Sequence, residues 1–314
     1  MNFIEKKTCL NTIRFFANEK PQLKKYKYEK FSTNYFLPEN PERKGVGGLR
    51  LKNFFKKSFR NKPLISVVTP NLKSNTLEES ILSVLRQEYE NIEHIVVDAD
   101  SGQKTLDLIE KYENHIDYWV SEKDYGLWDG WNKGLKLATG DYVGILDSTT
   151  TFDKDAISIL IKYINQNSDA DFIFGSIRKD NKIYTGFRPN DITLRFNIYP
   201  SCVISFFIKL ESLKKLGLYN TKYKINADYD LIYRMIVKHK MKGVTTKGNE
   251  IFGSFGETGI SKNYNFFQRL SAEIRVRYDN GQNLLIILYI FFGRCYKELF
   301  KTFRNFNIHF LNKN

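Results

Sequence analysis

Acidic side chains follow three separate apolar stretches of this sequence. Asp98 ends "IEHIVVD", Asp124 comes just after "IDYWVSE", and Asp147 ends "GDYVGILD". Helical patterns separate these stretches, which indicates βαβ units and a parallel sheet. In open sheets of this kind ligands bind at the carboxyl ends of the strands. A single carboxylate there is as readily a helix cap, but three at one edge predict a site for a polar ligand.

The loop after the first apolar stretch carries no glycine-rich phosphate motif. "TPNLKSNT" follows "LISVV", and it matches neither G-x-G-x-x-G nor G-x-x-x-x-G-K. A dinucleotide dehydrogenase and a P-loop NTPase are therefore disfavoured. A nucleoside diphosphate bound at this edge would need a metal ion or basic side chains in place of a backbone cradle.

The elements that must position these side chains begin at Pro63. Four buried strands alternate with helices at "TLEESILSVLRQ", "KTLDLIEKYENH" and "GLWDGWNKGLKLA". Thr76 and Glu79 have the spacing of a capping box for the first helix. His94 lies inside the second strand, where we predict a hydrogen-bonded packing role. From about Phe172 the strands become shorter and partly antiparallel, and beyond Asn265 a basic helical region continues to the end.

The stretch from "ISVVTPN" through "YWVSEKDYGLWDGWNKGLKLATGDYVGILDS" resembles the nucleotide-binding half of the family 2 glycosyltransferases, which are inverting enzymes of the GT-A fold. The resemblance covers about 45–260 and is closest to the bacterial O-antigen, capsule and exopolysaccharide branch. It implies an α/β, Rossmann-like mixed sheet flanked by helices. The expected parts are a basic extension at 1–62, a GT-A domain at 63–265 (nucleotide-sugar half 63–152, acceptor half 153–265) and a C-terminal amphipathic helical region at 266–314.

The resemblance also implies roles for individual residues. Asp98 would accept hydrogen bonds from the uracil or ribose of a nucleotide sugar. The Asp129–Lys133 pair has a simpler alternative, an i,i+4 surface ion pair. The full set that the resemblance places around the donor is Thr69, Pro70, Asp98, Asp100, Asp124, Asp129, Asn132, Lys133 and Asp147.

Asp228, in "NADYDL", matches the catalytic base of the family. Inverting transfer needs one general base to take the proton of the acceptor hydroxyl, and a carboxylate at a helix start facing a dehydrated cleft suits that task. The alternative is an acid placed there by the helix dipole. Relatives often carry His-Gln near "SCVISFF", where this chain has no histidine, and this departure weakens the acceptor side.

Asp147 is the candidate ligand for a divalent metal, Mg²⁺ or Mn²⁺. Thr149 and Thr150 stand where the family usually has carboxylates, and hydroxyl oxygens bind such metals less well. Three alternatives stay open: a metal held by Asp147 and the diphosphate, a metal-free site that uses Lys or Arg from the "FRPN" or "GISKN" loops, and a degenerate domain without catalysis.

The net charge of +14 is concentrated at the two ends of the chain. Residues 1–62 carry 16 Lys/Arg against 5 Asp/Glu, residues 283–314 carry 5 against 1, and the body between them carries 28 against 29. Basic ends on a near-neutral body predict attachment to an anionic surface, with solvated tails as the alternative. Since no nucleic-acid motif is present, we expect a membrane and no nucleic acid.

Two segments are candidates for that contact. "LKNFFKKSFRNK", 51–62, suits either a short basic amphipathic helix or a solvated linker. Residues 284–310 combine aromatic and basic side chains as an interfacial helix does, although a helix closing the domain core is the alternative. The apolar run 284–292 is too short to span a bilayer. The scattered Cys9, Cys202 and Cys295 indicate a reducing, cytosolic setting.

Together these features predict a cytoplasmic glycosyltransferase that is peripheral on the inner face of the cytoplasmic membrane. The expected donor is a UDP-hexose or UDP-N-acetylhexosamine, and the expected acceptor is a polyprenyl-linked or growing surface glycan. The rival hypothesis is a GT-A domain that has lost catalysis and acts as a binding protein in the same pathway.

Overall fold

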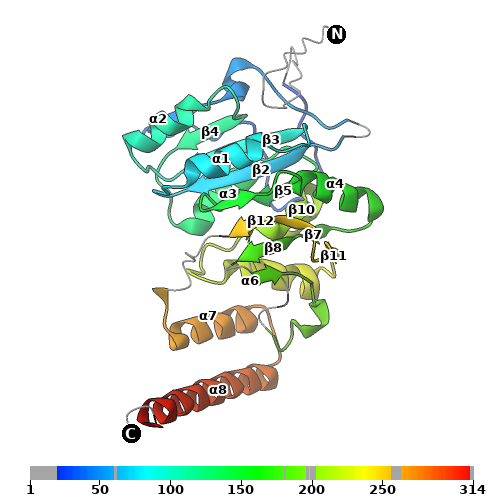
Figure 1. Cartoon of the computed structure of the whole chain (residues 1–314). Coiled ribbons are helices and arrows are strands. Elements are labelled where there is room, and N and C mark those ends of the chain that lie inside the picture. Colours follow the sequence, from blue (N-terminus) through cyan, green and yellow to red (C-terminus); the bar gives the residue numbers. More distant parts are fainter. Residues whose placement is uncertain are drawn as a thin grey trace.

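The computed structural model describes residues 20–59, 62–179, 182–195, 198, 203–255 and 263–311, with the backbone alone for 203 and 302–311. Within these ranges an eight-stranded mixed sheet forms the centre of the molecule (Figure 1). Its strands, in spatial order, are β1 (Gly45–Gly47), β4 (Tyr118–Ser121), β3 (Ile92–Asp98), β2 (Ile65–Asn71), β5 (Tyr142–Ile145), β10 (Phe206–Lys209), β7 (Phe172–Phe174) and β11 (Gly243–Thr245).

The four central strands β4, β3, β2 and β5 run parallel, as the alternating pattern predicts. Every residue of β2 and β3 is buried, since helices cover both faces of this part of the sheet. β1 joins one edge antiparallel to β4, and β10 joins antiparallel to both β5 and β7. The mixed α/β class inferred from the sequence is therefore confirmed.

The helices divide between the two faces of the sheet. They are α1 (Leu77–Leu85), α2 (Gln103–Lys111), α3 (Leu127–Leu137), α4 (Ala156–Gln166), α5 (Leu210–Leu216) and α6 (Ala227–Tyr233). Ile95 and Val97 pack with α3, α5 and α6, whereas Val96 packs with α1 and α2. This alternation along β3 follows from the period of two in a strand.

Helix α3 lies directly against the central strand. A Cβ added to Gly134 would come within 2.1 Å of Cγ1 of Val68, so only glycine allows this approach. The close packing fixes the start of α3, where Asp129 stands, relative to the end of β2.

The segment before β2 is part of the folded domain. Residues 45–47 add strand β1, and a 3-10 helix follows at Leu49–Lys52. Phe55 and Lys56 are 2% and 6% exposed. Neither the amphipathic helix nor the solvated linker predicted for 51–62 is therefore observed in the described part of that segment; the chain instead packs irregularly against the sheet.

A second, four-stranded sheet lies beside the central one. In spatial order its strands are β6 (Thr150–Phe152), β12 (Ile251–Phe255), β8 (Ser176–Lys179) and β9 (Lys182–Tyr184). Helix α6 continues as a π-helical turn, Arg234–Lys238.

The C-terminal region forms α7 (Phe266–Asp279) and α8 (Leu284–Leu311), which Figure 1 shows at the end of the molecule farthest from α2. The fully buried Arg277 of α7 donates to the carbonyls of Ile192 and Thr193 at 3.2 and 2.9 Å, and this anchors α7 to the domain. Among the helices so described, none has both the length and the apolar composition needed to cross a bilayer.

Candidate active site

The ends of β2, β3 and β4 meet at one point of the sheet edge, where Asn71, Asp98 and Ser121 are in register. Asp98 is fully buried. Its carboxylate accepts hydrogen bonds from Nδ2 of Asn71 at 2.7 Å, from Oγ of Ser121 at 2.7 Å and from the amide of Ser101 at 3.0 Å. Asp98 thus ties three strand ends together at the base of the edge. Asn71, Ser101 and Ser121 were not among the residues predicted from the sequence, although two of them occupy the same strand-end position as Asp98.

Thr69 and Pro70 are buried within β2. The hydroxyl of Thr69 lies 3.0 Å from Nε2 of His94, which is itself buried. Burial and the nearby Lys56 lower the pKa of His94 to about 3, so the ring is neutral at physiological pH. The predicted packing role of His94 is confirmed, and the Thr69 side chain is engaged in the same interaction.

Two turns at this edge hold non-glycine residues in the left-handed region. Lys73 has φ 51° and Asp100 has φ 55°, and the amide of Lys73 donates to Oγ of Ser101 at 2.8 Å. Such backbone conformations cost on the order of 1–3 kcal/mol each and are frequent at ligand sites. Leu72 and Tyr125 are 68% and 92% exposed in the loops of this edge. The loops of this edge therefore combine two strained turns with exposed apolar side chains.

A charge network occupies the loop after β4 and the first turns of α3. The ammonium of Lys133 lies 2.6 Å from Oδ1 of Asp124, 3.1 Å from Oε1 of Glu122 and 3.8 Å from Oδ2 of Asp129, and it donates to the carbonyl of Lys123 at 2.8 Å. The i,i+4 pair with Asp129 is thus present, but it is the longest contact. The ammonium of Lys133 is therefore engaged within the network, most closely with Asp124.

Burial and the neighbouring cations have opposite effects on the pKa values of the carboxyl groups in this network. Burial raises the pKa of Asp124, and the bond from Lys133 offsets only part of that effect. Burial would also raise the pKa of Glu122, but the hydrogen bonds from Lys133 and Arg43 outweigh it and hold that pKa below its usual value. A Cβ at Gly130 would lie 2.2 Å from Oδ2 of Asp124, so the carboxylate rests directly on α3. Asp124 is held in one place by both contacts.

Asp147 directs one carboxylate oxygen into its own loop. Oδ1 accepts from the amide of Thr149 at 3.0 Å and from its hydroxyl at 2.7 Å, while the hydroxyl of Thr150 donates to the carbonyl of Asp147 at 2.8 Å. Thr149 and Thr150, which stand where the family usually has carboxylates, therefore donate their hydroxyl hydrogens to Asp147 within the turn. Thr76, predicted to cap α1, instead donates from its side chain to the carbonyl of Ser148 at 2.8 Å, which binds this loop to the loop after β2.

Few of the described side chains near Asp147 could bind a divalent metal. The described residues include no group of three or more His, Cys, Asp or Glu side chains that could hold an ion. Oδ2 of Asp147 has no hydrogen bond within the described structure, and it is one charged oxygen of the kind such ions prefer. These residues fit a metal that has Asp147 as one ligand and diphosphate oxygens as most of the others.

Asp228 stands in the first turn of α6, after Asn226, whose φ is 69°. The side chain is half-buried, and this burial raises the pKa of Asp228 although backbone amides of the turn oppose it. Burial and then the charge of Asp228 raise the pKa of Tyr219. The Tyr219 ring stacks on Trp128 of α3 at a centroid distance of 5.5 Å.

The side chains of Asn132 and Asp230 are both bonded to other residues of the protein. Nδ2 of Asn132 donates to the carbonyl of Tyr219 at 2.8 Å, and its Oδ1 accepts from the amide of Tyr219 at 3.0 Å, so both ends of this amide are used inside the protein. Asp230 is buried and pairs with Arg234 at 2.9 Å and with Asn280 at 2.8 Å. A structural role for Asp230 agrees with its place on another face of α6.

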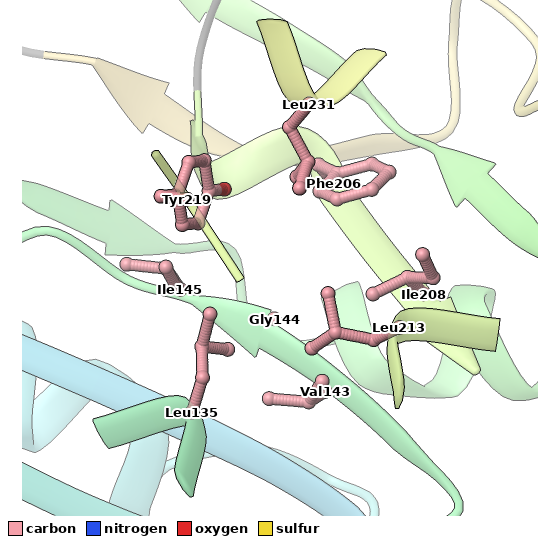
Figure 2. A pocket seen from close by; sticks show the side chains of 9 residues that line it. All are labelled: Leu135, Val143, Gly144, Ile145, Phe206, Ile208, Leu213, Tyr219 and Leu231. Carbon is pink, nitrogen blue, oxygen red and sulfur yellow. The ribbon is translucent and has the colours of Figure 1, made fainter. Parts of the chain in front are cut away.

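Behind Tyr219 lies a small apolar pocket between the central sheet and the helices α3, α5 and α6 (Figure 2). It is lined by Leu135, Val143, Gly144, Ile145, Phe206, Ile208, Leu213, Tyr219 and Leu231. The Tyr219 hydroxyl is the polar side-chain group in this lining. None of the predicted site residues lines it, so the pocket belongs to the core and not to the donor site.

Parts of the predicted site lie outside the described residues. The "GISKN" loop, 259–263, is described only at Asn263, and "SCVISFF" is described from residue 203. The "FRPN" loop is described, and Arg188 in it is exposed. A basic side chain for the leaving group therefore stays a prediction, as do the roles assigned to the individual site residues.

The mixed α/β sheet, with polar residues at the carboxyl ends of its parallel strands, matches the GT-A fold of similar solved structures. A family model, "Glycosyl transferase family 2", matches residues 66–265, and the chain belongs to that family. It is therefore a glycosyltransferase. The matched range begins after the N-terminal segment that carries β1.

Similar proteins support this class. A "PGL/p-HBAD biosynthesis glycosyltransferase" of Mycobacterium bovis is 26% identical over 239 residues, which cover 72% of this chain and 90% of that protein. The crystal structure of S. aureus TarS 1–349 with UDP-GlcNAc superposes with a TM-score of 0.54 at 15% identity, covering 74% and 73% of the two chains.

A third match is glucosyl-3-phosphoglycerate synthase from Mycobacterium tuberculosis, solved with Mn²⁺, UDP and phosphoglyceric acid. Its TM-score is 0.53 at 16% identity, with 70% of this chain and 80% of that chain covered. At these identities the two solved structures establish the fold.

Proposed function

We propose that this enzyme transfers a hexose or N-acetylhexosamine from a UDP-sugar to a polyprenyl-linked or growing surface glycan, with inversion. The observation that carries the proposal is Asp228: a half-buried carboxylate in the first turn of α6, whose pKa is raised by burial. The relatives solved with UDP-GlcNAc and with UDP support the donor class.

In the proposed reaction Asp228 takes the proton of the acceptor hydroxyl while that oxygen attacks the anomeric carbon. The bond between this carbon and the diphosphate oxygen breaks with its electron pair, so the nucleoside diphosphate leaves from the opposite face. One carboxylate and one displacement invert the anomeric configuration. In the proposed complex Asp124 accepts hydrogen bonds from hydroxyl or base N–H groups of the donor, and Asp98, which is fully buried, holds the strand ends beside it in place.

A metal ion bound with the donor would offset the charge of the departing diphosphate. Asp147 would hold it through Oδ2, since Oδ1 is bound to Thr149. Turnover in EDTA against added Mn²⁺ tests this, with Asp147→Ala and Thr149→Asp as variants. Loss of the metal response in Asp147→Ala is expected; full activity of the wild type in EDTA would contradict it.

The test of the base is Asp228→Asn. Because the amide cannot accept the proton, kcat should fall by roughly 10² or more while the donor Kd stays nearly unchanged. In the wild type, kcat should fall as the pH drops through the raised pKa of Asp228, because the protonated carboxyl cannot act as a base. Normal turnover in Asp228→Asn would refute the assignment, and inactivity of the wild type with every metal across a broad donor panel would favour a non-catalytic binding domain.

We also propose that α8 places the enzyme on the inner face of the cytoplasmic membrane. Leu285, Tyr289, Phe292 and Tyr296 recur at helical spacing and are 64–75% exposed, while Ile287 and Ile290 on the other side are buried. Exposed large apolar side chains along α8 are Leu284, Leu285, Leu288, Tyr289, Phe291, Phe292, Tyr296, Leu299 and Phe300.

Cations accompany this stripe. Lys297 and Lys301 are exposed and lie roughly 100° around the helix from Tyr296 and Phe300. An apolar stripe flanked by cations suits the interface of an anionic bilayer. Binding should therefore require anionic vesicles and weaken with salt; equal binding to neutral vesicles at every salt concentration would refute the electrostatic part.

A further inference from the structure

Arg43 reaches the candidate donor site from outside the part of the chain that matches the family. Its Nε lies 2.9 Å from Oε2 of Glu122, and its Nη2 donates to the carbonyl of Pro38 at 2.6 Å. The next residue, Lys44, donates from its amide to the carbonyl of Ser121 at 2.8 Å. Arg43 is thus held beside the end of β4 by both its side chain and its neighbour's backbone.

Glu122 stands between two cations. Arg43 contacts its Oε2, and Lys133 lies 3.1 Å from its Oε1. The Glu122 side chain is only 7% exposed, so water cannot replace either partner at little cost. The ammonium of Lys133 is shared in turn between Glu122 and Asp124, and the shorter contact, 2.6 Å, is with Asp124.

The sharing of Lys133 depends on Arg43. With Arg43 present, one oxygen of Glu122 is satisfied from the N-terminal side, and Lys133 remains close to Asp124. Without it, the buried charge of Glu122 would draw Lys133 toward itself. Asp124 would then lose its nearest cation while still facing the charge of Asp129.

We propose that Arg43 is a positioning residue for donor binding: by holding Glu122 it keeps Lys133 on Asp124, and so fixes the carboxylate that receives the donor. The inference rests on the proposed function, in which Asp124 binds the donor sugar nucleotide. Arg43 precedes residue 66, so this contribution comes from outside the range that the family model matches.

The geometry predicts that one substitution raises the donor KM and that a second substitution restores it. Arg43→Gln removes the cation and leaves Glu122 to compete for Lys133, so donor KM should rise at least fivefold while kcat stays within about twofold. In the double variant Arg43→Gln with Glu122→Gln the competitor is neutral, and Lys133 returns to Asp124. Donor KM of the double variant should then lie within about twofold of the wild type.

Lys44→Gln is the matched control. It removes the same charge one position away, its side chain is exposed, and its backbone bond to Ser121 is kept. Its donor KM should equal that of the wild type. If Arg43→Gln does not fold, as judged by thermal melting, Arg43→Lys replaces it, since it keeps the charge at Glu122 and should raise KM less than threefold in a folded protein.

Two results would overturn the inference: a donor KM in Arg43→Gln no higher than in Lys44→Gln, or a double variant worse than either single one. The latter would show that Arg43 only supports the local fold. For Arg43→Lys, an increase of tenfold or more would overturn it likewise.

Asp124→Asn separates this inference from the proposed function. If that variant binds the donor normally, the assignment of Asp124 fails, and with it the basis of the proposal. If it binds the donor weakly while Arg43→Gln is normal, only the role of Arg43 fails.

Discussion

The two basic ends of the chain look alike in composition but differ in structure. The N-terminal segment places its cations on acids of the domain, in six ion pairs: Lys24–Asp141, Arg43–Glu122, Arg50–Glu93, Lys52–Glu113, Lys56–Asp117 and Lys62–Glu90. In α8, Lys297 and Lys301 have no acidic partner among the residues described. The N-terminal segment thus neutralises acids of the domain, whereas in α8 only Arg294 has an acidic partner among the described residues, Glu273 at 3.6 Å, and Lys297 and Lys301 are exposed.

This difference shows that residues 63–282, although their net charge is near zero, contain buried acids whose ion-pair partners come from the N-terminal segment. Arg50 and Glu93 are each 2% exposed in their side chains, and Glu93 also accepts from Ser66 and Thr139. The guanidinium of Arg50 further donates to the carbonyls of Tyr35 and Leu137. Acids such as Glu93 can be buried only because cations from the N-terminal segment accompany them.

The largest effect is expected from Arg50→Met. Removing one partner of this buried pair leaves Glu93 charged and uncompensated, so the free energy of unfolding should fall by about 3–5 kcal/mol. Urea unfolding measures the loss, and adding Glu93→Gln should recover part of it. A loss below about 1 kcal/mol would show that the segment is not essential to the domain.

The opposite end is tested by Lys297→Gln with Lys301→Gln. Each cation near an anionic surface is worth about 1 kcal/mol, so partition onto phosphatidylglycerol vesicles should weaken roughly 30-fold. The control is Lys52→Gln with Lys62→Gln, which removes the same charge from the N-terminal segment. If both double variants bind the vesicles equally weakly, the two ends of the chain do not differ in their contact with the membrane.

The pH dependence of Arg50→Met sharpens the first test. Burial alone would raise the pKa of Glu93, but Arg50 and the hydrogen bonds outweigh it and lower this pKa in the wild type. The contribution of Glu93 is therefore present above its unfolded pKa of about 4.3 and is lost as the pH falls through the lower folded value.

In Arg50→Met burial acts unopposed by the cation, so the pKa of Glu93 rises and its protonation favours the folded state. The stability difference between wild type and variant should narrow by up to about 1.4 kcal/mol per pH unit on acidification. A difference that stays constant between pH 7 and pH 4 would contradict this account.

The smallest effect is expected from Lys62→Met. This ion pair with Glu90 lies at the surface, with side chains 51% and 35% exposed. Its loss should cost about 0–1 kcal/mol, and the cost should shrink at 1 M salt because exposed pairs are screened. A cost as large as that of Arg50→Met would mean that burial does not separate the two classes of pair.

Local patterns in the sequence predict much of this fold. The strands that end at Asp98 and before Asp124 and Asp147 follow from apolar runs, and the helix that begins near Asp228 follows from its periodicity. Such patterns depend on neighbours in the chain, which is why they can be seen without a structure. The placement of three acids at one sheet edge follows from the same reasoning.

Contacts between distant residues were not predictable in this way. Arg50 and Glu93 are 43 residues apart, and Thr76 gives its hydroxyl to a carbonyl 72 residues away instead of capping its own helix. Asn132 lies on the expected helix, yet both ends of its amide face Tyr219, 87 residues later. The predicted helix at 51–62 is not formed in the described part of that segment, and Lys56 within it is buried in an ion pair with Asp117, 61 residues later in the chain.

Strand β1 has a consequence for the order of events during synthesis. β1 pairs with β4. Lys56, which follows β1 in the chain, pairs with Asp117, which is synthesised 61 residues later. At about 5–20 residues per second, the ribosome needs roughly 3–12 s to supply that partner. Strand β1 and Lys56 are thus synthesised before the residues they pair with, so the Lys56 ammonium and the β1 backbone lack their native partners until β4 has been made.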